Sequence, residues 1–263
     1  GKMERKKLTP VNSVSRRFIA TLGFLVMMAG CQMGDSFESD FSSGEGTGGS
    51  MARFTVTGDH LYTVDHNSLK VFSLADPKKP VPKNNRNVGF DVETIFPLGN
   101  TLFLGTSTGM YIYDITLPEN PQKISFYEHI YACDPVVSDG RYAYVTLSSS
   151  NARCWRAGNE LQIVDIQDKV APKQVSTHAL SSPRGLAIRN DTLWVCDAGL
   201  KVFDVQNKSQ IKPLYHFKDV PAYDLILNGR LALVTGEEGF VQYRIGNDTD
   251  RKSTRLNSSH RIR

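Results

Sequence analysis

The stretch DVETIFPLGNTLFLGTSTGMYIYDITLPENPQKIS, which spans Asp91–Ser125, decides the fold of this 263-residue chain. It contains three short apolar runs, separated by Gly99-Asn100 and by Thr108-Gly109, and a weaker fourth run follows a Pro-x-x-Pro turn. Short runs rich in β-branched and aromatic residues and bounded by turn residues are typical of β-strands. Glycine and asparagine tolerate the positive φ angles that tight hairpins require. The stretch therefore predicts one antiparallel unit of four strands.

This unit recurs along the chain with a period of about 40 residues. Its second run appears as HLYTV, TLFLG, YAYVT, TLWVC and LALVT, which begin at positions 60, 101, 142, 192 and 231. Four short strands in each repeat of this length are typical of a β-propeller. We therefore predict an all-β fold, a β-propeller of about five four-stranded blades, with an inserted loop in the third repeat. The last blade is expected to lack its fourth strand, because the pattern ends near Asp250.

The third run of each repeat carries a family signature. It appears as MYIYDI, LQIVDI and LKVFDV, which end at Ile115, Ile166 and Val205. These runs resemble the LVIVD repeat of exported bacterial proteins, and GSMARF, CDPVV and GFVQY agree with short lipoprotein members of that family. The resemblance covers residues 48–246 and implies a propeller-like scaffold on the cell envelope. It implies no catalytic residue.

The first 31 residues are predicted to be a lipoprotein signal peptide. An apolar run at 18–29 follows a basic segment, as in a secretory signal. This run is shorter than the roughly 20 residues that a membrane-spanning helix needs. It ends in Met28-Ala29-Gly30-Cys31, which resembles a bacterial lipobox, so Cys31 is expected to be lipidated. Gln32 after the cysteine resembles the pattern that directs lipoproteins to the outer membrane.

The composition divides the rest of the chain into three parts. Residues 32–50 are rich in Gly, Ser and acids and predict a flexible tether. Residues 51–249 form the predicted propeller. Residues 250–263 lose the repeat and resemble translated adapter sequence, with a native basic tail as the alternative.

The basic pI of about 8.8 comes from the two ends of the chain. Residues 1–31 and 251–263 hold eleven of the 31 Lys and Arg residues but one of the 27 Asp and Glu residues, so the body between them has a net charge of −6. A mildly acidic body gives no electrostatic footprint for nucleic acid. Nucleic acid is therefore not a predicted partner.

A candidate ligand site lies where the first strands of the repeats enter the central channel of the predicted propeller. Alignment of these strands places five charged residues at equivalent positions: Arg53, Glu93, Asp134, Arg184 and Asp224. They form either a ring of salt bridges that closes the channel or a site in which Arg53 and Arg184 hold a small polar or anionic ligand. Hard cations need converging oxygen ligands, which two arginines oppose. No metal or other cofactor is predicted.

Three cysteines follow Cys31, and the predicted topology places them on the face that carries this site. In the oxidising envelope, Cys133–Cys154 is the predicted disulfide, and Cys133–Cys196 is the alternative. A nucleophilic cysteine would need an adjacent base, and the signatures of known cysteine proteases are absent from the sequence. The sequence also contains no phosphate-binding loop, no serine-hydrolase elbow and no dinucleotide fingerprint.

These observations favour an outer-membrane lipoprotein that acts as a non-catalytic binding or assembly scaffold. Its partners would be the membrane, through Cys31, and a protein or a glycan. Two alternatives stay open. A hydrolase of the lactonase type would use Glu93, Asp134 and Asp224 in the channel, and a glycan-binding protein would use exposed aromatic residues such as Trp155.

Overall fold

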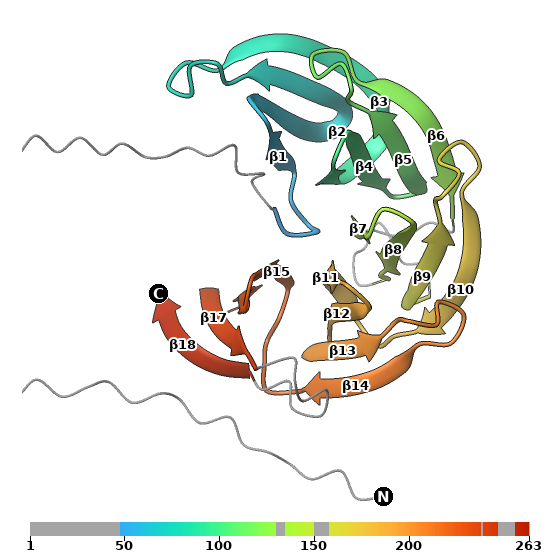
Figure 1. Cartoon of the computed structure of the whole chain (residues 1–263), viewed down its shortest axis with the longest axis vertical. Coiled ribbons are helices and arrows are strands. Elements are labelled where there is room, and N and C mark those ends of the chain that lie inside the picture. Colours follow the sequence, from blue (N-terminus) through green and yellow to red (C-terminus); the bar gives the residue numbers. More distant parts are fainter. Residues whose placement is uncertain (1–47, 130–134, 150–157, 238, 247–255, 263) are drawn as a thin grey trace, which may run out of the picture.

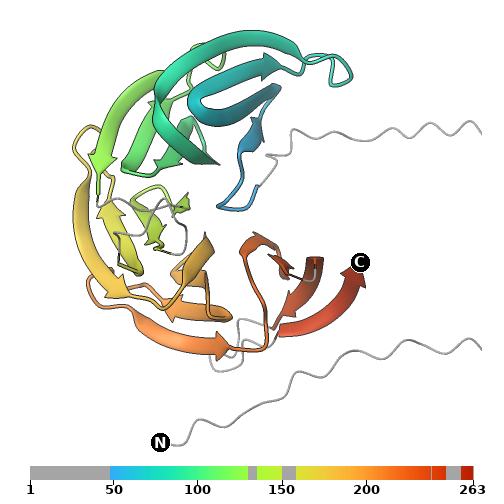
Figure 2. The same cartoon turned by 180° about the vertical axis from the view of Figure 1, so that it is seen from behind.

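The computed structural model describes residues 48–129, 135–149, 158–237, 239–246 and the strand at 256–262. In these residues every regular element is a β-strand, and none is a helix that could cross a membrane. The described residues form eighteen strands in four antiparallel sheets. Figures 1 and 2 show that the sheets follow one another along an arc around a common centre. The predicted all-β propeller fold is confirmed.

The first sheet contains six strands in chain order: β1 (Phe54–Thr57), β2 (His60–Ser73), β3 (Val81–Leu98), β4 (Thr101–Thr106), β5 (Gly109–Asp114) and β6 (Gln122–Glu128). The second sheet contains β7 (Val136–Ser138), β8 (Tyr142–Leu147), β9 (Glu160–Asp165) and β10 (Lys173–Ala179). The third contains β11 (Pro183–Arg189), β12 (Thr192–Asp197), β13 (Leu200–Asp204) and β14 (Lys212–Phe217). The last contains β15 (Asp224–Asn228), β16 (Leu231–Gly236), β17 (Gly239–Ile245) and β18 (Leu256–Ile262).

The predicted count of five separate blades is wrong, because the structure has four sheets. The first two repeats share the six-stranded sheet. β2 pairs with β1 through its first residues and with β3 through its later ones, and β3 continues on to pair with β4. Both long strands bend where the sequence pattern suggests a break. His66, Gly89 and Asp91 take positive φ angles of 26°, 139° and 51°, and the ladder continues past them through the pair His66↔Val92.

The predicted lack of a fourth strand in the last repeat is also wrong. β18 pairs antiparallel with β17 along the whole length from Phe240↔Ile262 to Ile245↔Leu256. The other rim strands, β6, β10 and β14, are exposed or half-buried. The outermost strand of a sheet therefore needs an extended backbone but does not need alternating apolar side chains. For that reason a polar stretch without the repeat can complete the sheet.

The hydrophobic core lies between successive repeats, and the alternation of side chains along each second strand creates it. In β12, Leu193 and Val195 pack against the second sheet, whereas Trp194 and Cys196 pack against the last sheet. The same arrangement joins the first two repeats within the six-stranded sheet, where Tyr62 clusters with Leu102. Each of the two middle sheets thus packs against a neighbour on both of its faces.

Candidate functional site

The segment before β1, residues 48–53, crosses the inner ends of the sheets. On one side, the carbonyl oxygen of Ala52 accepts a hydrogen bond of 2.9 Å from the backbone N–H of Ile95 in β3. On the other side, the hydroxyl oxygen of Ser50 accepts a hydrogen bond of 2.8 Å from the backbone N–H of Leu186 in β11. The segment therefore connects the first sheet to the third sheet.

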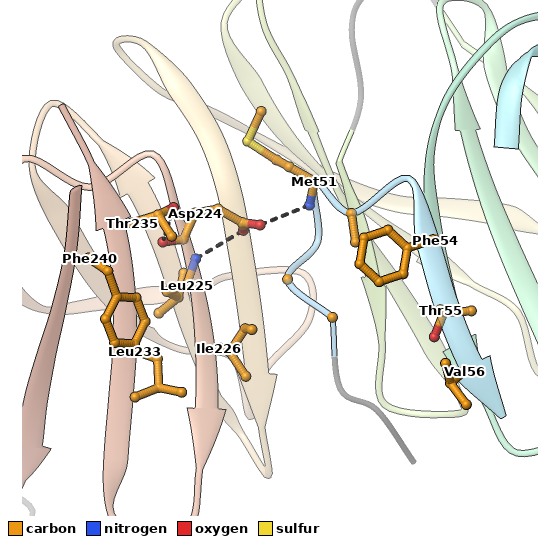
Figure 3. Close-up of a pocket in the computed structure, with 13 residues that line it drawn as sticks. Met51, Phe54, Thr55, Val56, Asp224, Leu225, Ile226, Leu233, Thr235 and Phe240 are labelled. Atoms are coloured by element: carbon orange, nitrogen blue, oxygen red, sulfur yellow. Dashed lines mark hydrogen bonds between the residues drawn. The ribbon is translucent and has the colours of Figure 1, made fainter. Parts of the chain in front are cut away.

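Asp224, the first residue of β15, holds this segment in place. Its carboxylate accepts hydrogen bonds from the Ser50 hydroxyl (2.9 Å) and from the backbone N–H of Met51 (3.1 Å), as Figure 3 shows for Met51. A Cβ atom at Gly49 or Gly185 would collide with this carboxylate, so two glycines make room for it. Burial raises the pKa of Asp224, although the hydrogen bonds from Met51 and Ser50 act in the opposite direction. We call this arrangement of residues 49–51, Gly185 and Asp224 the clasp.

Two further polar side chains lie beside the clasp. The guanidinium carbon of Arg184 lies 4.0 Å from the centre of the Tyr223 ring, which is a cation–π contact. Cys196 at the end of β12 is buried and carries a free thiol. Burial raises the pKa of Cys196, the charge of Asp224 raises it further, and Arg184 opposes both. The thiol is thus held in its protonated, weakly nucleophilic form.

Four of the five predicted channel residues lie in the part of the chain that the structure describes. Asp224 forms the clasp and Arg184 lies beside it on the Tyr223 ring, whereas Arg53 is exposed and Glu93 is half-buried. In the described part of the chain, none of these four forms an ion pair with another. The described residues also contain no group of three or more His, Cys, Asp and Glu side chains arranged to hold a metal ion. The use of these residues as a ligand site stays a prediction.

Several predicted positions lie outside the described residues: Cys31, Cys133, Asp134, Cys154 and Trp155. The predicted lipidation, the Cys133–Cys154 disulfide and the glycan-binding role of Trp155 therefore stay predictions as well.

A buried carboxylate that the sequence pattern did not reveal lies at the end of β12. Asp197 accepts hydrogen bonds from the backbone N–H groups of Ser181 (3.0 Å) and Ser182 (2.6 Å) and from Lys201 Nζ (2.6 Å). Burial by itself would raise the pKa of Asp197, but the bonds from Lys201, Ser182 and Ser181 lower it below its usual range. An acid directly after an apolar run is the signal that could have identified this position. All three partners come from the same sheet or its entry loop, which indicates a structural role.

A mainly apolar cleft of about 470 Å³ separates the two ends of the arc. On one side lie residues 48–56, including Phe54 of β1, and on the other side lie β15, β16 and β17 (Figure 3). Leu233 and Phe240 line the side of the last sheet. Asp224 also lines the cleft, so the clasp borders it.

Comparisons with known proteins identify the fold of this chain but no family. No protein-family model matches the chain, and no curated protein matches it by sequence. The LVIVD resemblance therefore rests on the motifs in the sequence.

Several solved structures do match. A periplasmic gluconolactonase from Pseudomonas aeruginosa is 15% identical with a TM-score of 0.58, and the match covers 77% of this chain and 67% of that one. A protein from Lactobacillus plantarum is 13% identical with a TM-score of 0.59, over 77% and 67% of the two chains. A functionally unknown protein from Desulfotomaculum acetoxidans is 13% identical with a TM-score of 0.61, over 79% and 68%. At such identities these similarities show the β-propeller fold alone, and the chain spans about two thirds of each of these proteins.

Proposed function

We propose that this protein is a lipid-anchored β-propeller of the bacterial cell envelope that acts as a non-catalytic binding or assembly scaffold. The clasp is the observation that carries the proposal. A channel enzyme would need the Asp224 carboxylate free to meet a substrate, whereas Ser50 and Met51 of the same chain occupy both of its oxygens. The acid at the centre of the arc thus serves to hold the chain together.

The location is proposed from two independent observations. The first is the sequence around Cys31, which resembles a lipobox and is followed by Gln32, a residue typical of outer-membrane sorting. The second is the fold, which is shared with a periplasmic protein of Pseudomonas aeruginosa. The motifs that resemble the LVIVD repeat agree with this location.

The anchor is tested by expressing the whole chain in a Gram-negative host fed with an alkyne-labelled fatty acid. We expect the wild-type protein to carry the label and to sediment with the outer membrane. The Cys31→Ser variant should be unlabelled and should leave that membrane fraction. Cys196→Ser is the matched control and should keep the label, because Cys196 is buried within the propeller. An unlabelled wild-type protein would overturn the proposed anchor.

Lack of catalysis is tested against the principal alternative, a lactonase. The purified full chain is incubated with glucono-δ-lactone, and the acid released on ring opening is followed with a pH indicator. We expect the rate to equal that of buffer. The exposed turn residue Asp76 provides the control variant Asp76→Asn. If the rate exceeds that of buffer, disappears in Glu93→Gln and persists in Asp76→Asn, the protein is an enzyme and the scaffold proposal is overturned.

A further inference from the structure

Among the residues that the structure describes, the fifth repeat is less well covered on one face than the four earlier repeats. In the first four repeats, the middle residue of the second strand is a large aromatic that packs toward the following repeat. These residues are at most 1% exposed: Tyr62, Phe103, Tyr144 and Trp194. The equivalent residue of the fifth repeat is Leu233, which is half-buried and lines the cleft.

The third strand shows the same difference. The position that faces the following repeat is a fully buried aliphatic residue in each of the first four repeats: Val71, Ile112, Ile163 and Val202. In the fifth repeat this position is Gln242, and its neighbour on the same side of β17 is Phe240; both are half-buried. We call the surface formed by Ile226, Leu233, Phe240 and Gln242 the open face of the last sheet.

Within the described part of the chain, the first repeat is less well covered on its opposite side. In the second to fifth repeats, three apolar positions pack against the preceding repeat and are buried; for example, Leu102, Tyr113 and Ile115 of the second repeat are at most 3% exposed. The equivalent residues of the first repeat are Leu61, Phe72 and Leu74, and all three are half-buried. We call these three residues the open face of the first sheet.

We propose that the open face of the last sheet packs against the open face of the first sheet of a second molecule of this protein. The two faces carry the same classes of residue that pack together at each junction between repeats within the chain, so the contact would continue an interface that the molecule already contains. In one molecule the first and last sheets stand at the two ends of the arc (Figures 1 and 2). Leu233 and Phe240 of the last sheet face the cleft, whose other side is lined by residues of β1 and the segment before it. Apolar patches left in contact with water commonly mark interaction sites.

This inference rests on the proposed scaffold function and names its partner. Because different faces meet, the contact is of the head-to-tail kind, and each added molecule presents a new free face. Association would therefore continue beyond a dimer as the concentration rises. On a membrane surface, lipid anchoring would raise the local concentration of the molecules and favour such an assembly.

The test uses the full chain with Cys31→Ser, so that detergent micelles do not contribute to the mass, and measures sedimentation over a wide concentration range. We expect species larger than a monomer that grow with concentration. Leu233→Arg removes the open face of the last sheet, Phe72→Arg removes that of the first sheet, and each variant alone should be monomeric. Leu214→Arg on β14 is the control: Leu214 is 42% exposed on the rim, and this variant should associate like the parent.

A one-to-one mixture of the Leu233→Arg and Phe72→Arg variants is the decisive measurement. The first variant keeps an intact first-sheet face and the second keeps an intact last-sheet face, so the mixture should form a heterodimer that does not grow further. Formation of this heterodimer also shows that both variants are folded. A parent protein that stays monomeric, a mixture that stays monomeric, or a Phe72→Arg variant that still dimerises alone would each overturn the proposal. A negative result here leaves the fatty-acid label and the lactone assay unchanged, so it is distinguishable from failure of the scaffold function.

Discussion

The Ser50 hydroxyl donates a 2.9 Å hydrogen bond to the carboxylate of Asp224, a residue 174 positions further along the chain. This bond joins the segment before the first strand to the first strand of the last sheet. The bond from the Leu186 N–H to the same Ser50 hydroxyl ties in the third sheet. One serine side chain thus links three parts of the arc that share no sheet.

Replacing Asp224 tests how much the clasp stabilises the fold. Asp224→Ala leaves the Ser50 hydroxyl and the Met51 N–H without their acceptor, and we expect the free energy of unfolding to fall by about 1–3 kcal/mol. Asp224→Asn should cost less, because its amide oxygen can still accept one of the bonds and no charge is buried. Denaturant unfolding measures both, with Asp76→Asn as the exposed control. Equal stability of the alanine variant and the wild type would show that the clasp contributes nothing.

Asp224 and Asp197 should respond to pH in opposite directions. The pKa of Asp224 is raised in the folded protein, so its contribution to stability is present below the unfolded-state pKa of about 4 and is lost as the pH rises through the folded value. The pKa of Asp197 is lowered, so its contribution is present above about pH 4 and is lost as the pH falls through the folded value.

The measurement is the free energy of unfolding of three proteins between pH 3 and 7. Relative to the wild type, Asp224→Asn should gain stability as the pH rises above about 4 and through the folded-state pKa of Asp224. Asp197→Asn should lose stability relative to the wild type on going from acid to neutral pH. Curves that run parallel to that of the wild type would contradict both assignments.

Glycine at position 185 is required by the closeness of the Asp224 backbone. A Cβ atom at Gly185 would contact the Asp224 carboxylate and would lie 2.8 Å from the Asp224 Cα atom, which cannot move without displacing β15. Gly185→Ala should therefore destabilise the protein by about 1–3 kcal/mol, in the range of other overpacking substitutions. Gly49→Ala should cost less, since the three atoms nearest to its Cβ belong to the Asp224 side chain, which can move more easily than backbone. Gly158→Ala is the control and should be neutral in thermal melts, because its Cβ meets no atom of the described residues closer than 4.0 Å.

Equivalent positions in the fourth and fifth repeats should differ in their contribution to stability. Trp194 is 1% exposed between two sheets, so Trp194→Ala should lower the free energy of unfolding by about 3–5 kcal/mol. Leu233 occupies the same place in the last sheet but is half-buried, so Leu233→Ala should cost about 1 kcal/mol when measured at low protein concentration. A cost at Leu233 as large as that at Trp194 would mean that the open face is covered within the single molecule.

The strands of the fold could be predicted from the sequence because each repeat carries its own turn residues and its own alternation. The second strands around Phe103, Tyr144 and Trp194 are read directly from this pattern. The joining of the first two repeats could not be read in the same way. It depends on the backbone bends at His66, Gly89 and Asp91, where paired strands continue through positions that resemble turns.

The candidate site was predicted only in part. Equivalent positions in the repeats identified Asp224, which forms the clasp, and Arg184, which lies beside it; their use as a ligand site stays a prediction. The partner of Asp224 was hidden, because Ser50 lies in a stretch of Gly and Ser that reads as a tether and has no counterpart in the other repeats. Asp197 was missed for a similar reason, since its partners Ser181 and Ser182 belong to a loop rather than to the repeat.

The clasp also has a consequence for the order in which the protein folds. Neighbouring sheets can pair and pack as soon as they are synthesised, but residues 48–53 must wait for β11 and β15 before Ser50 finds its partners. Contacts between residues so distant in sequence form late. Closing the loop between them costs less conformational entropy once the intervening sheets have folded. Substitutions at Ser50 or Asp224 should therefore speed unfolding while leaving the folding rate almost unchanged. The clasp would then slow the unfolding of the complete propeller and so determine the lifetime of the folded protein.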